Sequence, residues 1–505
     1  MFGRDLISLM RAGYVLAREG AFAPVDARAL PAGPRTAITL ARLIERREGG
    51  RRLAGALERL GPSYVKLGQF LATRRDLVGQ RVATDLSSLQ DRLPPFDTRE
   101  ARKAVEDELG QPIEEMFAEF GGPVAAASIA QVHKARLKDG RAVAVKILRP
   151  GVERRFARDL RTFATAARLG EAFSGEARRL RLKAVGEELA RSAKIEMDLR
   201  LEAAAIAEMG ENTKDDAGFR VPAVIWEATG RRVLTTEWID GHPMSDLEGL
   251  RASHHDLPKL AVNAIQSFLR HAMRDGFFHA DMHPGNLFVE PDGTLVAVDF
   301  GIMGRLGSRE RTFLAEILWG FIRQDYRRTA EVHFEAGYVP HTQSVDDFAQ
   351  ALRAIGTPIR DQSASDISMA RLLAQLLEVT ELFSMRTRPE LLLLQKTMVV
   401  VEGVARNLDP RFDMWASAEP VVGEWIARNL GPAGRIAGAA DGLGTVARVA
   451  QHVPNLLQRA ERLAQDFADA AEEGRLRERQ TNRCRDTALW IGAVSLAVIA
   501  LAQVF

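Results

Sequence analysis

The sequence predicts an α+β fold of two lobes, preceded by a helical extension and followed by a transmembrane helix. Strand-like apolar runs are concentrated between residues 125 and 239, whereas helical patterns occupy most of residues 256–415. A segment at 276–301 that carries the main sequence motifs interrupts the helical region. The last 19 residues carry no charged side chain. These observations predict a strand-rich lobe, a mainly helical lobe and a membrane anchor.

Residues 1–118 form the predicted helical extension, since they contain long mixed stretches of apolar and charged residues and few strand-like runs. Leu6, Leu9, Met10 and Tyr14 recur at the spacing of an amphipathic helix. This helix either packs on the protein's own core or lies on a membrane surface, and we favour the first. Charged residues interrupt the apolar positions, so a signal peptide is not expected.

The strand-rich lobe is predicted over residues 119–240. A Gly-Gly-Pro-Val turn at 121–124 precedes an apolar run at 125–132, and a Lys-Asp-Gly turn signal separates that run from a second one at 141–146. Two apolar runs joined by such a turn indicate a β-hairpin.

Helical patterns return at 152–212, and residues 231–239 are a further strand candidate. The mainly helical lobe is predicted over 241–415. Residues 416–486 are expected to form a C-terminal helical segment, in which the Gly- and Ala-rich stretch 432–445 is a flexible connection.

Residues 487–505 are predicted to cross a membrane as a helix. At 1.5 Å per residue they would span about 28 Å, close to the hydrocarbon core of about 30 Å. The alternative is a buried core helix, which is less favoured for a terminal apolar segment. An Arg-rich flank precedes it, and the positive-inside rule then keeps the bulk of the chain in the cytoplasm. The flanking arginines are Arg477, Arg479, Arg483 and Arg485.

Bulk composition narrows the function classes. A net charge of +2 gives no sign of a nucleic-acid binder that depends on phosphate contacts. The single cysteine, Cys484, excludes an intramolecular disulfide framework and a cysteine-based zinc site. A cytosol-facing location fits this cysteine usage.

One loop and the strand after it carry residues suited to phosphoryl transfer. Asp281 and Asn286 lie five residues apart in His-Ala-Asp-Met-His-Pro-Gly-Asn, and Asp299 opens an Asp-Phe-Gly motif after a strand-like run. Their oxygens suit Mg²⁺, so we expect Asn286 and Asp299 to hold metal and Asp281 to orient or deprotonate the acceptor. The order and spacing predict an atypical, two-lobed, protein-kinase-like fold. The loop histidines, His279 and His283, are expected to order the loop by hydrogen bonds.

Upstream, Val-Ala-Val-Lys at 143–146 matches the strand-borne lysine of kinases, whose ammonium pairs with nucleotide phosphates. Glu202, in a helical pattern, is the candidate partner of Lys146. The strand that ends near residue 239 would supply the hinge that meets adenine.

With these motifs the chain resembles the UbiB (AarF-like) family of atypical protein-kinase-like proteins, which is associated with ubiquinone biosynthesis. The resemblance covers roughly residues 20–420, with one departure at Arg75, where a Pro is common. The motifs that carry it are Lys66-x-Gly68-Gln69, Leu89-Gln90-Asp91 with Pro94-Pro95, the alanine-rich loop Ala125–Val132, Glu196-x-Asp198 and the catalytic loop His279–Asn286.

The resemblance implies a Mg²⁺-dependent kinase or ATPase that binds ATP or ADP and supports ubiquinone (coenzyme Q) biosynthesis at the bacterial inner membrane. Its partners would be membrane lipids or quinone intermediates and ubiquinone-biosynthesis enzymes. It also implies that the Lys66 helix covers the active site, with Lys66 reaching the Glu196 and Asp198 carboxylates. The implied regulatory residues are Lys66, Gly68, Gln69, Glu196 and Asp198. The implied nucleotide-binding residues are Val124, Ala125, Ala126, Ala127, Ser128, Ile129, Ala130, Gln131, Val132, Lys146, Glu237, Trp238 and Ile239.

Two local questions stay open at this level. Glu196 and Asp198 are two residues apart and would face nearly opposite ways on one helix. Either a helix begins near residue 196 or the two carboxylates serve different partners. The alanine-rich loop lacks the backbone freedom of a glycine loop, so we expect an altered nucleotide pose or altered selectivity.

Other function classes remain. A non-catalytic, nucleotide-gated lipid-binding scaffold would use the same nucleotide site. A protein kinase acting on peptides is disfavoured, because neither an Ala-Pro-Glu motif nor a long activation segment follows Asp299. The sequence indicates neither the phosphoryl acceptor nor the oligomeric state.

Overall fold

The computed structural model describes residues 2–19, 39, 52–73, 75–86, 89, 94–173, 175–360, 379, 382–385 and 389–431. The chain divides into two units, Met1–Gly423 and Glu424–Phe505, and all the sites discussed below lie in the first. The predicted anchor at 487–505 and the predicted connection at 432–445 lie outside the described residues. Among the helices that are described, none is long and apolar enough to cross a membrane.

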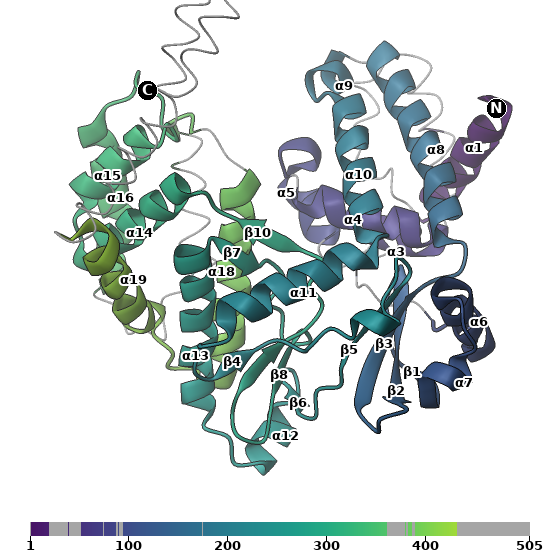
Figure 1. Ribbon diagram of the computed structural model, residues 1–505. Coiled ribbons are helices and arrows are strands. Elements are labelled where there is room, and N and C mark those ends of the chain that lie inside the picture. The colour runs from purple at the N-terminus through teal and green to yellow at the C-terminus, as the bar shows by residue number, and fades with distance from the viewer. Residues whose placement is uncertain are drawn as a thin grey trace, which may run out of the picture. The chain divides into compact units, whose positions relative to one another are not determined.

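An antiparallel sheet of four strands, in the order β1-β2-β3-β5, forms the strand-rich lobe (Figure 1). The predicted hairpin is confirmed at its turn, because β2 and β3 pair in register around Lys138-Asp139-Gly140, but its first strand begins at Ala130, since residues 125–126 end β1. The strand predicted near 231–239 is also confirmed. The strands are β1 Phe117–Ala126, β2 Ala130–Leu137, β3 Ala142–Leu148 and β5 Val233–Glu237.

The prediction of a turn at Gly121–Val124 is wrong, because these residues lie inside β1. β1 is an edge strand, and its register against β2 shifts between Phe120 and Pro123 and again between Pro123 and Ala125. Irregular pairing at an edge tolerates proline and glycine, which lack a donor or a side chain to pack. The Pro and Gly signals therefore mark bulges here.

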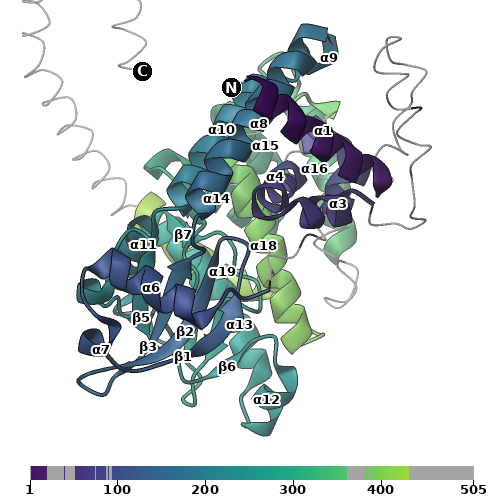
Figure 2. The ribbon, with the colours of Figure 1, turned by 90° about the vertical axis from the view of Figure 1, so that its right-hand side faces the viewer.

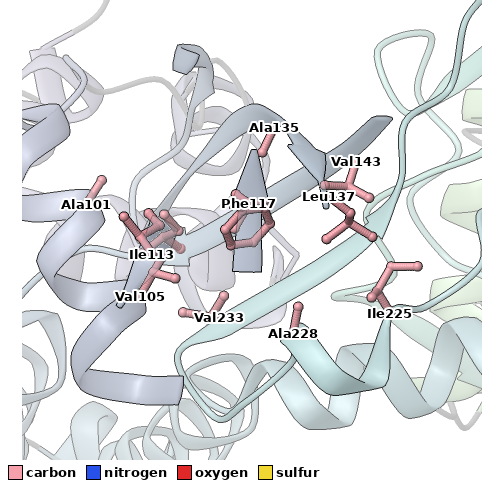
Figure 3. Close-up of a cluster of buried hydrophobic side chains, with 12 residues drawn as sticks. Ala101, Val105, Ile113, Phe117, Ala135, Leu137, Val143, Ile225, Ala228 and Val233 are labelled. Atoms are coloured by element: carbon pink, nitrogen blue, oxygen red, sulfur yellow. The ribbon is translucent and has the colours of Figure 1, made fainter. Parts of the chain in front are cut away.

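Two short helices cover one face of this sheet (Figures 1 and 2). Asp97 accepts a hydrogen bond from the Arg99 N–H and caps α6, and Gly110 ends it in a left-handed conformation. Apolar side chains of both helices meet inward-facing residues of all four strands in one buried cluster (Figure 3). The helices are α6 Thr98–Leu109 and α7 Ile113–Met116. The cluster contains Ala101, Val105, Ile113, Phe117, Ala135, Leu137, Val143, Val145, Ile147, Ile225, Ala228 and Val233.

The amino-terminal part is helical in its described segments. Ala12 and Leu16 of the first helix join a core cluster with the helices that follow, as expected for a helix that packs on its own protein. Ile7, Met10 and Tyr14 of the same helix are exposed, so the helix forms as predicted but the apolar face predicted through Met10 and Tyr14 is not the face that packs. The helices are α1 Phe2–Arg18, α3 Arg52–Leu60, α4 Pro62–Thr73 and α5 Arg75–Leu86.

Four helices follow β3, and the last of them packs against β5. Asp198 caps the start of that last helix, since its carboxylate accepts a hydrogen bond from the Arg200 N–H. The helices are α8 Val152–Phe173, α9 Gly175–Arg179, α10 Leu182–Glu196 and α11 Leu199–Thr213.

The second lobe is mainly helical, as predicted, and three of its short strands, β7, β8 and β9, lie in the motif-bearing segment. The strands form a sheet in the order β4-β9-β8-β6 and a separate β7–β10 pair. The strands are β4 Phe219–Arg220, β6 His242–Pro243, β7 Phe277–His279, β8 Leu287–Val289, β9 Leu295–Ala297 and β10 Met303–Arg305. The helices are α12 Leu247–Ala252, α13 Leu257–Arg270, a π-helical turn His271–Asp275, α14 Ser308–Arg323, α15 Tyr326–Glu335, α16 Val345–Arg360, α18 Pro389–Leu408 and α19 Met414–Leu430, whereas a 3₁₀ turn at Trp226–Ala228 packs against β5 of the first lobe.

Candidate active site

A lysine between two carboxylates lies at the centre of the site. Lys146 on β3 places its Nζ 2.7 Å from Glu202 Oε1 and 2.9 Å from Glu202 Oε2. The same Nζ lies 2.8 Å from Asp299 Oδ1. Glu202 is buried on α11, which packs beside β5. The predicted Lys146–Glu202 pair is therefore present, and Asp299 joins it.

Asp299 adopts an unusual backbone conformation. Its φ is +62°, in the left-handed region that residues other than glycine rarely occupy. Asp tolerates this region better than most residues, yet the conformation still costs roughly 1 kcal/mol or more. Outliers of this kind cluster at functional sites, where the surrounding structure enforces them.

The hairpin of β8 and β9 brings Asn286 and Asp299 to one end. Asn286 comes directly before β8 and Asp299 two residues after β9, and the Val298 N–H donates to the Asn286 carbonyl at 2.8 Å. The Asn286 side-chain NH₂ donates to the Asp281 carbonyl at 3.1 Å, which leaves the amide oxygen as an acceptor. Lys146 contacts Asp299 through Oδ1, which leaves Oδ2. The two remaining oxygens are donors of the hard type that Mg²⁺ prefers.

Charges around Lys146 set the protonation states. Burial opposes the ammonium, but the charges of Asp299 and Glu202 raise the pKa of Lys146. The Lys146 charge in turn holds the pKa of the Asp299 carboxyl well below its usual range. Burial raises the pKa of Glu202. A cation and an ionised Asp299 carboxylate therefore persist at neutral pH, ready for phosphate and metal respectively. Among the described residues, no group of three or more His, Cys, Asp or Glu side chains forms a separate metal site.

The catalytic loop is ordered by its histidines, as predicted. The Asp281 N–H donates to His279 Nδ1 at 3.1 Å, so Nδ1 is an acceptor, and Nε2 must then donate to the Val298 carbonyl at 3.1 Å. Burial lowers the pKa of His279, which agrees with this neutral tautomer. His283 Nδ1 accepts from the Gly285 N–H at 3.0 Å. His279 thereby links the backbone at Asp281 to the strand that leads to Asp299.

Helix α18 adds two side chains to this loop that the sequence did not predict. The Thr397 hydroxyl, fully buried, lies 3.0 Å from the carbonyl of Ala280 and 2.8 Å from the carbonyl of Leu393 one turn earlier, and its one proton serves both acceptors. Lys396 Nζ lies 3.9 Å from Asp281 Oδ1. No motif spacing links α18 to a loop more than 100 residues earlier, so sequence reasoning had no signal for this contact.

The alanine-rich loop is a tight turn between β1 and β2. The Ala127 N–H donates to the Ala130 carbonyl at 2.7 Å, and Ala125 and Ala126 pair with β2. Arg149 donates from Nε and Nη2 to the Ala127 carbonyl and from Nη2 to the Pro94 carbonyl. The Arg149 guanidinium thus fixes the backbone of this loop, which lacks the conformational freedom of a glycine loop.

Two predicted nucleotide-binding side chains are engaged elsewhere. Gln131 is buried, accepts from the Phe96 N–H at 2.9 Å and donates to His133 Nε2 at 2.7 Å. Glu237, at the end of β5, accepts from both Nη atoms of Arg220 at 2.9 Å. Arg220 also bonds Glu290 in the turn between β8 and β9, and so ties the first sheet to the second. In the predicted hinge, the backbone N–H groups of Glu237 and Trp238 also have partners, since they donate to the carbonyls of Ala223 and Ala142.

The Lys66 motif contacts the site through α10, and the open question about the two carboxylates is answered. α10 ends at Glu196, whose Oε2 lies 2.6 Å from Lys66 Nζ. Asp198 caps α11 and pairs with Arg200, with Oδ2 2.7 Å from Nη2. The two carboxylates thus have different partners, and Lys66 reaches only Glu196.

Gly68 has a packing role in the same motif. A Cβ built there would lie 2.3 Å from Leu89 Cδ1 and 2.7 Å from Leu57 Cδ1. The α4 helix can approach α3 and the segment at Leu89 only if this position has no side chain. Gln69 is half-buried on the same helix.

The chain after Asp-Phe-Gly is short and fixed. Phe300 is buried beside His279, with ring centroids 5.0 Å apart. β10 pairs with β7, and α14 begins at Ser308. Arg305 on β10 bonds Glu208 on α11 at 2.7 and 2.6 Å. A peptide-docking segment of the kind found in protein kinases has no room between Asp299 and α14.

Comparisons with known proteins agree with this geometry. Residues 88–333 match the ABC1 atypical kinase-like domain, and residues 352–413 match the UbiB helical domain. A probable protein kinase UbiB of Marinobacter nauticus is 38% identical over 83% of this chain and 76% of its own length. The Azotobacter vinelandii protein of the same name is 37% identical over 88% of this chain and 83% of its own length.

A solved structure shares the fold. Rv3197 of Mycobacterium tuberculosis, determined in complex with erythromycin, is 25% identical and has a TM-score of 0.51. The match covers 72% of this chain and 93% of that one. The domain matches, the two relatives and the kinase-like site together show that the chain belongs to the UbiB family of atypical kinase-like proteins.

Proposed function

We propose that the chain is an ATP-binding, Mg²⁺-dependent atypical kinase or ATPase that supports ubiquinone biosynthesis. The observation that carries the proposal is Lys146, held between Glu202 and Asp299 at 2.7–2.9 Å beside the Asp281 loop. Phosphoryl transfer needs a cation for the phosphates, metal ligands and a carboxylate for the acceptor, and these residues are of those types.

Each residue has a distinct part in the proposed chemistry. Lys146 would bind the nucleotide phosphates, with Glu202 fixing its position. Asn286 and Asp299 would hold Mg²⁺, which supplies charge neutralisation at the phosphates when bound. Asp281 would orient the acceptor hydroxyl or water and receive its proton.

The acceptor is proposed to be a lipid intermediate, a biosynthetic partner or water. The short, hydrogen-bonded chain between Asp299 and α14 supports this choice, because protein kinases dock peptides on a longer segment at this place. The association with ubiquinone synthesis rests on the UbiB name of the relatives.

We also propose a location at the bacterial inner membrane, with a single anchor at 487–505 and the catalytic part in the cytoplasm. Support comes from the uncharged terminal stretch and its arginine flank. Deletion of residues 487–505 should move the protein toward the soluble fraction. An unchanged distribution after the deletion would count against the anchor.

ATP hydrolysis tests the catalytic proposal. Purified full-length protein would be assayed with Mg²⁺-ATP and vesicles of anionic lipid, with or without a quinone-like lipid, beside Asp281→Asn. We expect the variant to lose about 100-fold or more in turnover while it still binds nucleotide, since a positioned base contributes about 10²–10⁴-fold.

Equal turnover in both proteins would refute catalysis at Asp281. If Asp281→Asn also supported full quinone synthesis in cells, the nucleotide-gated lipid-binding scaffold would become the better account. These two measurements therefore separate the two function classes.

A further inference from the structure

The catalytic loop brings no lysine or arginine to the place where a phosphoryl group would move. Between Asp281 and Asn286 it contains only Met282, His283, Pro284 and Gly285. Lys146 is already shared between Glu202 and Asp299. The developing charge of phosphoryl transfer is usually stabilised by cations that surround the moving group. A protein cation on the acceptor side of the phosphoryl group, in addition to Lys146 and the proposed Mg²⁺, would have to come from another part of the chain.

Helix α18 supplies a candidate, Lys396. Its Nζ lies 3.9 Å from Asp281 Oδ1, and its side chain is 47% exposed. Thr397, the next residue, is buried and bonds the Ala280 carbonyl at 3.0 Å. The Thr397 contact joins α18 to the loop, and the neighbouring Lys396 places its ammonium beside the Asp281 carboxylate.

The Lys396–Asp281 contact is a poor stabilising ion pair. A half-exposed pair at 3.9 Å contributes little to folding, because solvent screens it and the long side chain loses rotamer entropy. His283 Nε2 also lies 3.9 Å from Asp281 Oδ2, but the Nδ1 atom of this ring accepts a hydrogen bond from the Gly285 N–H. A lysine ammonium is a compact point charge with three donors, which suits a phosphate oxygen. The geometry leaves Lys396 close to Asp281 and still able to bind an anion.

We propose that Lys396 is a catalytic residue that contacts the phosphoryl group during its transfer to the acceptor held by Asp281. The inference rests on the proposed function. In the step, the acceptor oxygen forms a bond to the γ-phosphorus, and its proton passes to the Asp281 carboxylate. The bond from the γ-phosphorus to the β–γ bridging oxygen breaks, and ADP keeps that electron pair. Lys396 gains and loses no proton, and its charge offsets the negative charge on the moving group.

The test compares Lys396→Met and Lys396→Arg with Lys138→Met, a change of an exposed lysine in the β2–β3 turn. Full-length protein is assayed for Mg²⁺-ATP turnover, for ADP affinity, and for affinity of ADP with aluminium fluoride, which occupies the position of the moving phosphoryl group. We expect Lys396→Met to lower turnover and aluminium fluoride-dependent affinity about 10- to 100-fold, in line with the loss of one charge-stabilising donor. ADP affinity should change less than about 3-fold, because the ADP moiety lacks the contacted group. Lys396→Arg should restore most of the loss, and Lys138→Met should match the unmodified chain.

A double variant separates direct contact from an effect through Asp281. If Lys396 touches the phosphoryl group, Lys396→Met lowers the residual turnover, or the aluminium fluoride-dependent affinity, of Asp281→Asn further. No further loss in that background would mean that Lys396 only positions Asp281, and would overturn the inference.

The failures are distinguishable. If the unmodified chain binds no nucleotide, both the proposed function and this inference are refuted. If it binds nucleotide and Lys396→Met leaves both turnover and aluminium fluoride-dependent affinity unchanged, only the inference falls.

Discussion

The lysine between two carboxylates gives the sharpest prediction about stability. Lys146→Met removes the cation that Glu202 and Asp299 share, and leaves a buried carboxylate next to a second one. Glu202→Gln keeps the shape of the side chain and an acceptor for Lys146, which still has Asp299. The double variant removes both members of the buried pair. These three variants form a double-mutant cycle.

The magnitude follows from the distances and exposures. At N–O distances of 2.7–2.9 Å and an effective dielectric of about 20, each contact has a gross Coulomb energy of about 6 kcal/mol. Most of this is offset by desolvation, which costs several kcal/mol per ion. The exposed fractions are 19% for Lys146 and 8% for Glu202, but 51% for Asp299, so solvent screens the Asp299 contact more strongly.

We therefore expect Lys146→Met to cost about 3 kcal/mol, because it strands the buried Glu202 carboxylate. Glu202→Gln should cost about 1–2 kcal/mol, since a neutral hydrogen bond remains. The loss of stability in the double variant should be smaller than the sum of the two single losses by about 1–2 kcal/mol.

Thermal unfolding of nucleotide-free protein at pH 7.5 is the assay. A loss of about 3 kcal/mol corresponds to a fall in Tm of roughly 6–12 °C for a domain of this size class. Either of two results would refute the reasoning. One is a double variant whose loss of stability equals the sum of the two single losses. The other is a Lys146→Met protein whose Tm lies within about 1 °C of that of the unmodified chain.

Three further predictions concern residues outside this cluster. Burial lowers the pKa of His333 to about 4, below the ordinary 6.5, so the unfolded state takes up a proton before the folded state as the pH falls. The free energy of unfolding should therefore fall by about 1.4 kcal/mol per pH unit between pH 6.5 and pH 4. His333→Gln should make Tm depend less on pH in that window. Gly68→Ala should cost about 1–3 kcal/mol through overpacking, and the Tm loss that it causes should be smaller when it is introduced into a Leu89→Ala chain than into the unmodified chain. Lys66→Met should speed hydrogen exchange in α4 by breaking its pair with Glu196, and exchange as slow as in the unmodified chain would show that the pair does not hold the helix.

The sequence predicted the residues whose spacing is local. The β2–β3 hairpin was predictable because a Lys-Asp-Gly turn separates two apolar runs, and its pairing then fixes the position of Lys146. Asp281 and Asn286 lie in one short loop, so their spacing along the chain was enough to predict that they lie close together. The conformation of β1 was not predictable in the same way, because bulged pairing with β2 overrides its Gly and Pro signals.

Most contacts between segments that are distant along the chain could not be predicted from the sequence. The Lys396 and Asp281 side chains lie close together because α18 packs on α13 and contacts the catalytic loop, and no periodic pattern specifies that packing. The hydrogen bonds of Arg220 to Glu237 and Glu290 were also not predictable, since they join two sheets formed by separate segments. For Glu196 and Asp198 the sequence left two arrangements, and a helix end at residue 196 decides between them.

Metal-dependent nucleotide binding tests the central claim most directly. The affinity of the full-length chain for ADP would be measured with Mg²⁺ and again with a chelator, beside Asp299→Asn. If Asn286 and Asp299 hold the metal at the nucleotide phosphates, Mg²⁺ should strengthen binding by about 10-fold or more, worth about 1.4 kcal/mol, and the variant should lose that gain. Nucleotide affinity that does not respond to Mg²⁺ in either protein, or a Mg²⁺ effect that survives Asp299→Asn, would contradict the account.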